Sequence, residues 1–589
     1  MNRTVQTRLM PQTEALLVKL MTEKRDLVID GQRVFAGSSD PGGDKFLGGK
    51  IADGMAYLIL ATPRDDPRFA RYVSGFRELS RLTLDDRLDT WGIYYYMAAL
   101  DQLQQAGLLE QCVDADTLAA LKVKLDWRTF VRPDLSLINL PNNYYGVAFA
   151  ISGMRHKLGW QDDTGMNALV AKVLGHYRTF SESGFADETE GDGRFDRYSV
   201  LLIGEIAHHY VEIGLQPPPE VRAWLRGSAQ LALNRLNAQG DGFEYGRSIG
   251  AYGDTALVEL VTIAAYLDVL TPQEKEAAYA YASVAADKYV HFWVDADTGS
   301  VNLWDKGRRT DAYRGKHRIL GENLSLAQQY EYTNALWNEM GYADRTPSAD
   351  LVAWRRARPE LTTTWFARGI YDRALVTRRD GDRLIGLPMI NGGDGQHMNS
   401  PYYPIPFSPG LVAGVADSSL PQLLPQVTLS DGVKLAPLAY FKQIEVTTDQ
   451  GVTSVTYHQD ETDRLGQPKP QPDARLKART TYRFMAHTIT RTDVLTPTQA
   501  LDAASIDIEF ASYSPGLQLT HDGTNWTATY AEGAARRFTV SGFANCTLDA
   551  VQDPAYQTPS GPFVSRVKCS TGKMTLASPV TLSWRLDYE

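Results

Sequence analysis

A polar segment rich in arginine and tyrosine stands directly before one of the clearest helical patterns in this 589-residue sequence. The segment Asp192–Tyr198 reads Asp-Gly-Arg-Phe-Asp-Arg-Tyr, and a run of apolar residues at helical spacing follows it. The N-terminal end of a helix carries the positive pole of the helix dipole and free backbone N–H groups, which favour anions. Arg194, Arg197 and Tyr198 are therefore predicted to face an anionic ligand.

Similar clusters precede other helical patterns at a regular interval. They are Asp89–Trp91, Asn142–Tyr145 and Gly246–Ser248 with Tyr252 nearby, and successive clusters lie about fifty residues apart, the length of one helical hairpin with its loops. Consecutive hairpins pack side by side, so every second helix starts at the same end. The clusters could instead be ordinary helix caps, but a cap needs only one short polar residue and no Tyr-Tyr or Arg-Tyr pair beside it. The spacing therefore favours an α/α toroid, incomplete or built of six hairpins, whose inner helices begin around one mouth.

The residue types in these clusters suit the elimination of a glycosidic oxygen beside a uronic acid. That reaction needs amide or guanidinium groups to neutralise the carboxylate, a base for the proton on the neighbouring carbon, and an acid for the leaving oxygen. Asn142 or Asn143 with Arg247 would neutralise the carboxylate, and Tyr198 or Tyr252 would act as both base and acid. A positive charge beside a phenol favours its ionised form, which suits this role.

Other polar and aromatic side chains near the clusters are candidates for substrate binding. A basic loop at 306–318 could clamp an acidic saccharide, although it could also be a solvated surface loop. A loop at 396–403 could reach over the mouth from the C-terminal part of the chain. The residues predicted to bind substrate are Trp91, which would stack on a sugar ring, and Tyr144, Tyr145, Arg194, Arg197, Tyr245, Arg314, His317 and His397.

Composition excludes several classes of partner. The formal net charge is −10, so there is no overall basic field and nucleic acid is not expected as the main partner. No apolar run is long enough to span a membrane. The expected partner is an acidic polysaccharide or oligosaccharide, and the oligomeric state is left open. No signal peptide is visible, which predicts a cytoplasmic protein, or a secreted or periplasmic one if a signal has been removed.

No cofactor and no metal are predicted. The sequence lacks a P-loop, a dinucleotide-binding fingerprint and a zincin motif. The three cysteines, Cys112, Cys546 and Cys569, are too few and too scattered for a zinc site. Cys546 and Cys569 could pair, but buried free thiols are the favoured interpretation.

The hydrophobic pattern changes its period along the chain. Residues 1–345 carry a helical period, 346–361 are charged and contain prolines, and 362–589 alternate with a period of two between Asp-Gly and similar turns. The prediction is an α+β multidomain protein with an N-terminal α/α toroid, a linker and a C-terminal antiparallel β-sandwich.

The layout resembles that of the polysaccharide lyases that act on hyaluronate, chondroitin and xanthan. The segments that carry the resemblance are Asn143–Tyr145, Asp192–Phe195 and Gly246–Ile249. The resemblance implies an α/α toroid joined to large antiparallel sheets, and β-elimination as the reaction. The family has a catalytic His soon after the Phe, but this chain has Asp-Arg-Tyr at 196–198, so the family's His–Tyr pair does not carry over. His208 and His209 lie about three turns into the helix, and at least one of them is expected in the core.

Two other functions stay open. A glycoside hydrolase on the same toroid would need a pair of carboxylates. The candidates at the predicted mouth are Asp89, Asp187, Glu188, Glu190, Asp196 and Glu205. The third possibility is a carbohydrate-binding protein without catalytic activity.

Overall fold

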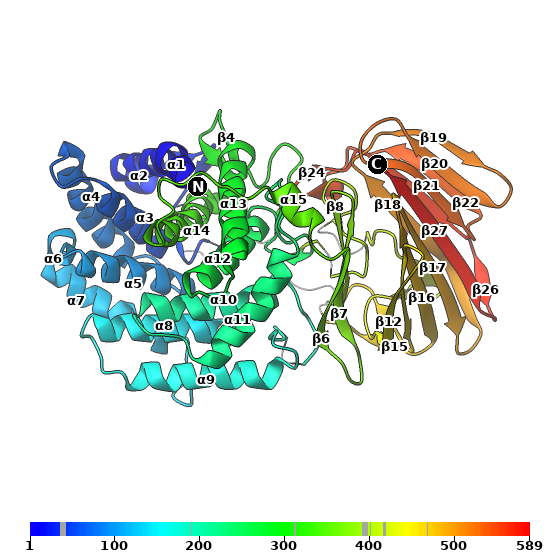
Figure 1. Ribbon diagram of the computed structural model, residues 1–589, viewed down its shortest axis with the longest axis horizontal. Helices are drawn as coiled ribbons and strands as arrows, with labels where there is room; N and C mark the ends of the chain where they lie inside the picture. The colour runs from blue at the N-terminus through cyan, green and yellow to red at the C-terminus, as the bar shows by residue number, and fades with distance from the viewer. Residues whose placement is uncertain are drawn as a thin grey trace.

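The computed structural model describes residues 1–35, 43–189, 191–310, 314–391, 398–400, 402–415, 420–467 and 469–589. Helices form one half of the molecule and antiparallel sheets the other, as Figure 1 shows in blue to green and in yellow to red. This arrangement confirms the predicted fold class.

Within the described residues, six inner helices form a closed ring. Each packs against the next, and the last returns to the first. They are α3 (Leu47–Ala61), α5 (Thr90–Gln105), α8 (Tyr144–Lys157), α10 (Arg197–Glu212), α12 (Ala251–Tyr266) and α14 (Ile319–Glu339). The α/α toroid is therefore complete and has six inner helices.

An outer layer of helices covers this ring. Polar residues start several of these helices: Asp66 and Asp114 cap α4 and α7, and Thr271 with Glu274 forms a reciprocal capping box on α13. The outer helices are α2 (Met10–Glu23), α4 (Pro67–Leu84), α7 (Ala115–Lys124), α9 (Thr164–Phe180), α11 (Pro219–Leu233) and α13 (Pro272–Lys288), with the short α1 (Asn2–Thr4) and α6 (Leu109–Cys112) beside them.

Helix α3 is unusually rich in glycine for an inner helix. Helix α3 contains Gly48, Gly49 and Gly54, which lower its helix propensity. Gly49 is required because a Cβ there would lie 1.9 Å from the carbonyl oxygen of Gly92 on α5. Close packing of two inner helices thus outweighs the local cost of glycine.

The segment predicted as a linker contains a short, packed helix. Helix α15 (Leu351–Arg356) lies between the end of α14 and the first strand of the β-region, and Asp350 caps it. Trp354 is buried, and its Nε1 donates to the carbonyl oxygen of Leu233 at 3.1 Å. A buried tryptophan thus fixes this part of the predicted linker, 346–361, against the end of α11.

A three-stranded antiparallel sheet joins the two halves. It consists of β6 (Leu361–Ala367), β7 (Arg373–Asp380) and β8 (Arg383–Met389), and it lies next to the helices in Figure 1. Phe366 of β6 stacks on Phe195 of the loop before α10, with ring centroids 4.8 Å apart. The sheet thus touches the segment that positions the start of an inner helix.

Two larger antiparallel sheets form the predicted sandwich. Apolar side chains of the two sheets meet between them: Phe510 on β18 packs against Phe538 on β21 at 4.8 Å. One sheet contains β15 (Pro472–Asp473), β14 (Thr462–Arg464), β11 (Lys434–Ala436), β10 (Gln426–Leu429), β18 (Leu501–Ser512), β25 (Ser565–Ser570) and β22 (Asn545–Ala550), with β26 (Met574–Leu576) paired to β18. The other contains β12 (Lys442–Asp449), β13 (Val452–Gln459), β16 (Leu476–Met485), β17 (Thr488–Pro497), β27 (Val580–Tyr588), β21 (Ala535–Ser541), β20 (Asn525–Tyr530) and β19 (Gly516–His521).

The expectation of three free thiols is wrong for two of them. Cys546 and Cys569 form a disulfide, because they stand directly opposite each other on the paired strands β22 and β25. Cys112 is a buried free cysteine.

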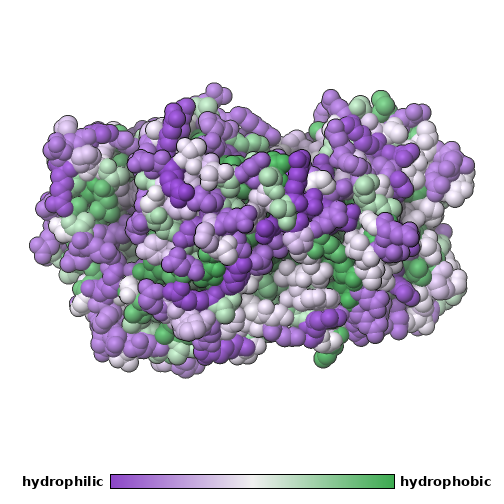
Figure 2. Space-filling view, in the orientation of Figure 1, coloured by the Kyte–Doolittle hydropathy of each residue, from purple (hydrophilic) through white to green (hydrophobic). Residues whose placement is uncertain are grey.

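The outer surface shown in Figure 2 is mostly hydrophilic, with smaller hydrophobic areas over both halves. In the described ranges, no helix combines the length and the apolar character needed to cross a bilayer.

Candidate active site

A cavity of about 510 Å³ lies inside the helical ring. Each inner helix contributes a side chain from its first turns, so the six helices begin around one mouth. These side chains are Lys50, Trp91, Tyr144, Tyr198, Tyr252 and Glu322. Asn143, Tyr198 and Arg247, which carry the predicted chemistry, line this one cavity.

Asp196 fixes the start of α10 and so positions Tyr198. Its Oδ1 accepts the backbone N–H of Tyr198 at 2.9 Å, as an N-cap does. Its Oδ2 accepts from Tyr402 Oη at 2.9 Å, and the carboxyl is fully buried. Burial raises the pKa of Asp196, while the nearby Arg194 opposes that effect. Asp196 is thus a structural residue beneath the cavity wall.

Two guanidinium groups flank the ring of Tyr198. The Cζ atoms of Arg197 and Arg247 lie 4.8 and 4.0 Å from its centroid. Tyr198 Oη donates to Ser248 Oγ at 3.0 Å, and Arg314 Nη2 donates to the same oxygen at 3.1 Å. Ser248 has a left-handed backbone with φ 52°, which is unfavourable for a residue with a Cβ. A strained turn therefore places one hydroxyl between the phenol and a third cation.

The acidic segment before α10 organises its own loop. Asp187 Oδ2 accepts the backbone N–H groups of Gly191 and Gly193 at 3.0 and 2.7 Å. Glu188 pairs with both Arg247 and Arg194, the latter at 3.0 Å. These carboxylates have structural partners, so they are poorly placed to act as the pair that hydrolysis would need.

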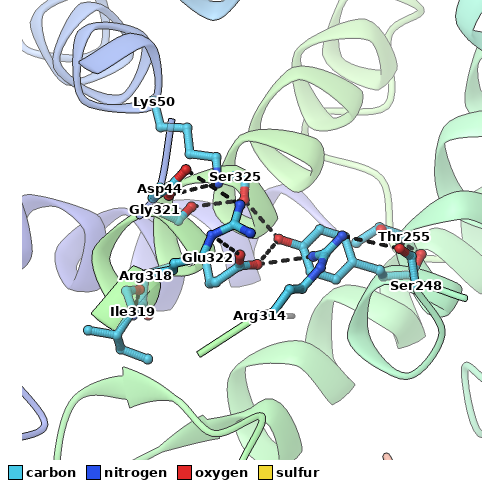
Figure 3. Close-up of polar contacts among 12 residues, drawn as sticks. Asp44, Lys50, Ser248, Thr255, Arg314, Arg318, Ile319, Gly321, Glu322 and Ser325 are labelled. Carbon is cyan, nitrogen blue, oxygen red and sulfur yellow. Dashed lines mark hydrogen bonds and ion pairs between the residues drawn. The ribbon is translucent and has the colours of Figure 1, made fainter. Parts of the chain in front are cut away.

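A charge cluster surrounds Glu322 at the start of α14 (Figure 3). Arg314 Nη1 lies 3.1 Å from Glu322 Oε2, and Arg318 Nε lies 3.7 Å from Oε1. Asp44 pairs with Lys50 at 3.2 Å and with Arg318 at 3.4 Å. Three cations therefore face two carboxylates in this part of the described chain, which leaves one positive charge in excess.

The cluster determines the protonation states of Glu322 and Tyr252. Burial raises the pKa of Glu322, but the charges of Arg314, Lys50 and Arg318 outweigh it and hold the pKa at about 2. Burial and the Glu322 charge raise the pKa of Tyr252 well above its usual value. Tyr252 Oη donates to Glu322 and bonds Ser325 Oγ at 2.9 Å. Tyr252 is therefore a committed hydrogen-bond donor, which disfavours it as a base.

Aromatic rings form a further part of the wall. Trp91 lies 5.4 Å from Tyr94 and 6.4 Å from Tyr144, centroid to centroid, and Tyr95 lies beside them. All four line the cavity. Such a wall offers apolar ring faces to a sugar.

Asn143 presents an amide close to these rings. Its side chain is 6 % exposed, and its Oδ1 is buried without a hydrogen-bond partner in the described part of the chain. Buried amide atoms normally have a partner. Asn143 lines the cavity, and the N–H groups of its amide are the atoms that can donate to a carboxylate there, whereas its oxygen can only accept.

The floor of the cavity is acidic and carries two histidines. Glu205, Glu259 and Tyr332 line it, together with His208 and His209. Burial raises the pKa of Glu259 to about 7, helped by Glu205 and opposed by Arg197. Burial also raises the pKa of Glu205.

Three groups at the floor are close enough together to be metal ligands. The donor atoms of His208, His209 and Glu212 lie within 4.8 Å of one another. The same carboxylate already accepts from Tyr94 Oη at 2.7 Å and bonds His209 Nδ1 at 2.9 Å. His209 is buried, in line with the expectation that at least one of the two histidines belongs to the core.

Five of the predicted site residues do not line the cavity. Tyr145 is turned about 100° from Tyr144 around α8 and packs on His176 of α9. Tyr245 donates to the carbonyl oxygen of Phe195 at 3.1 Å in the domain interface. The five are Asn142, Tyr145, Arg194, Tyr245 and His317, of which Arg194 pairs with Glu188 behind the wall. His397, like Glu190, lies outside the described residues.

Two lysines of the basic loop pair with neighbouring acids outside the cavity. Lys306 pairs with Asp295, and Lys316 pairs with Asp30 at 3.2 Å. Arg314 and Arg318 instead line the cavity. The loop is thus mainly structural and contributes two cations to the site.

Sequence reasoning missed Lys50, Glu259, Glu322 and Tyr332 on the cavity wall, and it named Arg318 only as part of the basic loop. The apolar residues alone predict a helix that starts at Leu324, whereas α14 begins at Ile319 and includes Glu322 in its first turn. A Glu in the first turn of an expected inner helix, preceded by arginines, would have been a usable signal. The glycines of α3 weaken its helical signal, so the sequence did not mark Lys50 as a residue at the start of an inner helix.

Together, the fold and the cavity define an α/α toroid with a cation-lined site, joined to an antiparallel β-sandwich. The structure is similar to that of the Streptomyces coelicolor A3 chondroitin AC lyase in complex with chondroitin sulphate, with a TM-score of 0.54 and 14% identity over 99% of this chain and 79% of that chain. At this identity the likeness shows a shared fold, which is the fold that the sequence resemblance implied.

Two other solved structures match less well. A chondroitinase AC lyase has a TM-score of 0.47 and 10% identity over 99% of this chain and 83% of that chain. The unsaturated glucuronyl hydrolase of Bacillus sp. GL1 has a TM-score of 0.39 and 14% identity over 61% of this chain and 100% of that chain. No protein-family model matches the chain, and no curated protein matches it.

Proposed function

We propose that the protein is a polysaccharide lyase that cleaves a uronate-containing polysaccharide or oligosaccharide by β-elimination. The observation that carries the proposal is the convergence of Asn143, Tyr198 and Arg247 in one cavity, with Arg314 close by. An amide donor, a phenol between guanidinium groups and an excess of positive charge are what a uronate and its developing negative charge require.

In the proposed reaction, Asn143 and Arg247 bind the uronate carboxylate, and Arg247 exchanges its contact with Glu188 for the substrate. Tyr198, as phenolate, removes the proton from C5. The electron pair forms the C4=C5 double bond as the C4–O bond breaks, and the leaving oxygen takes a proton from Tyr198. One proton moves from carbon to oxygen, no water is consumed, and no oxidant or metal is needed for the balance.

The geometry supports Tyr198 over Tyr252 in this role. A phenolate at Tyr198 would lie beside Arg197 and Arg247, which favour negative charge. A phenolate at Tyr252 would lie against the carboxylate of Glu322. Tyr252 would instead orient Glu322 and the cations around it.

A glycoside hydrolase is the second candidate, and one observation favours it. Glu205 and Glu259 both line the cavity, and the raised pKa of Glu259 would suit a general acid. The hydrolysis reaction would then take place at the floor of the cavity and not at its mouth.

One experiment separates the two candidates. The protein is incubated with a panel of acidic polysaccharides and oligosaccharides, and ultraviolet absorbance of the unsaturated uronate is recorded beside the release of reducing ends. A lyase raises both together. Reducing ends without absorbance would support the hydrolase, and binding with neither signal would support a carbohydrate-binding protein.

We also propose an extracytoplasmic location, secreted or periplasmic. The Cys546–Cys569 disulfide supports it, because structural disulfides persist in oxidising compartments.

A further inference from the structure

The cavity is deep along the axis of the ring. Both Arg197 and His209 of α10 line it, and at 1.5 Å per residue they are about 18 Å apart along the helix. Glu322 and Tyr332 on α14 likewise span about 15 Å. The site is therefore a shaft that leads inward from the mouth. A substrate that only lay across the mouth would leave the inner half of this shaft empty.

The inner end of the shaft is closed in the described part of the chain. The cavity lining ends at His209 on α10, Glu259 on α12 and Tyr332 on α14. These helices continue to Glu212, Tyr266 and Glu339, so the cavity does not reach their far ends. A saccharide chain can enter such a shaft with one end but cannot pass through it.

The charge changes between mouth and floor. Lys50, Arg314 and Arg318 stand near the mouth with Glu322 (Figure 3). At the floor, Glu205 and Glu259 face the cavity, and Arg197 is the cation that acts on both. An anionic sugar at the floor would meet these carboxyl groups, whereas an uncharged sugar would find hydrogen-bond partners.

The floor has polar groups suited to sugar hydroxyls. Gln328 and Gln329 of α14 line the cavity, and Gln329 Oε1 is buried without a hydrogen-bond partner among the described residues. Tyr332 stacks on His208 with centroids 4.4 Å apart, which fixes both rings. A hydroxyl-rich ring would satisfy these groups.

From this geometry we infer that the floor is a subsite for an uncharged terminal sugar, while the uronate is held at the mouth. The protein would then bind and cleave acidic saccharides from a chain end. The inference rests on the proposed function for the cleavage and on the cavity alone for the binding. It predicts that long chains are shortened from an end and are not cut internally.

Binding stoichiometry tests the inference without turnover. The Tyr198→Phe variant is titrated with one acidic polysaccharide prepared in several narrow size fractions, and bound protein per chain is measured by analytical ultracentrifugation. End binding predicts a number per chain that does not change with chain length. A number that grows in proportion to length overturns the inference, and so does failure to bind any fraction.

Product analysis of the active protein gives an independent answer. At equal uronate mass, the initial rate should rise in proportion to the number of chain ends, and viscosity should fall slowly while absorbance rises. A fast loss of viscosity at low conversion overturns the inference but leaves the lyase proposal intact. Absence of absorbance, with constant stoichiometry in the binding experiment, overturns the lyase proposal and supports the end-binding subsite.

A double variant tests the charge preference at the floor. At about pH 8, above the raised pKa of Glu259, Glu205→Gln with Glu259→Gln should bind chains with an anionic terminal sugar roughly tenfold more tightly, since like-charge repulsion is removed. The matched control is Glu331→Gln, a buried carboxyl that does not line the cavity and should leave the preference unchanged. If the double variant and the wild type discriminate equally between anionic and uncharged terminal sugars, the assignment of an uncharged sugar to the floor is overturned.

Discussion

At the scale of single residues, the cavity assigns different tasks to two similar tyrosines. Tyr198 has two guanidinium groups on its ring and a serine hydroxyl on its oxygen. Tyr252 has its hydroxyl committed to Glu322 and Ser325. One phenol is placed to exchange protons and the other to hold charges in position.

We therefore expect Tyr198→Phe to lower kcat by about 10²–10⁴-fold, the usual contribution of a general acid–base group, while substrate binding is kept. Tyr252→Phe is the matched control and should lower kcat less than about tenfold, because it removes one positioning hydrogen bond. Initial rates from the absorbance assay and binding by calorimetry measure both effects. Near-normal turnover in Tyr198→Phe would remove this residue from the mechanism.

Two buried carboxyl groups that do not line the cavity make stability depend on pH. Burial, with Glu212 nearby, raises the pKa of Asp53 to about 8, and burial with Asp53 nearby raises that of Glu331 to about 8. Carboxyls in the unfolded chain titrate near 4. The folded state therefore holds more protons between about pH 4 and 8, so the free energy of unfolding falls as pH rises through this window.

It follows that Asp53→Asn combined with Glu331→Gln should stabilise the protein by about 1 kcal/mol or more at pH 8 and much less at pH 4. Denaturant unfolding at both pH values measures the difference. Removing the exposed Glu110 carboxyl by Glu110→Gln should change little at either pH. An equal effect of the double variant at both pH values would argue against the raised pKa values.

At the scale of secondary-structure elements, ring closure depends on close approach of helix backbones. Gly49 on α3 faces the backbone of Gly92 on α5, and neither can carry a Cβ without displacing backbone atoms. The two helices carry Lys50 and Trp91 to the cavity. Small residues in the seam thus determine where a cation and a stacking ring lie.

We predict that Gly49→Ala destabilises the protein by about 2 kcal/mol or more, since overpacking a backbone contact is costly. The same substitution at Gly175, which lies in α9 with open space around its Cα, should instead stabilise by about 0.5–1 kcal/mol through helix propensity. Thermal and denaturant unfolding measure the change in the free energy of unfolding for both variants, including its sign. Two changes of the same sign would show that the seam between α3 and α5 tolerates a methyl group.

At the scale of the whole molecule, the β-region is part of the site. Strand β9 (Met398–Ser400) pairs with β3 (Gly246–Arg247). A segment of the β-region therefore supports the short strand that carries Arg247. Tyr402 donates to Asp196, the cap of α10. The two halves therefore have to be docked for Arg247 and Tyr198 to take their positions.

The disulfide gives a prediction at the same scale. Thiol titration of the denatured, unreduced chain should find one free cysteine, Cys112, and three after reduction. Replacing Cys546 and Cys569 by Ser should lower the stability of the sandwich by about 2–4 kcal/mol, as is typical when a disulfide is removed. Three thiols without reductant, in protein prepared under oxidising conditions, would contradict the pairing.

The sequence by itself predicted the change from helices to strands along the chain, and it proposed three residues, Asn143, Tyr198 and Arg247, that the structure brings to one cavity. These features have strong local signals, because the hydrophobic period and the start of a helix depend on residues that are neighbours in the sequence. Only the tertiary structure decided which side of each helix faces the cavity. One position along a helix turns a side chain by about 100°, so Tyr144 faces inward while Tyr145 packs outward. Lys50 and Glu322 likewise meet only after the ring closes, because contacts between residues far apart in the chain leave no local pattern.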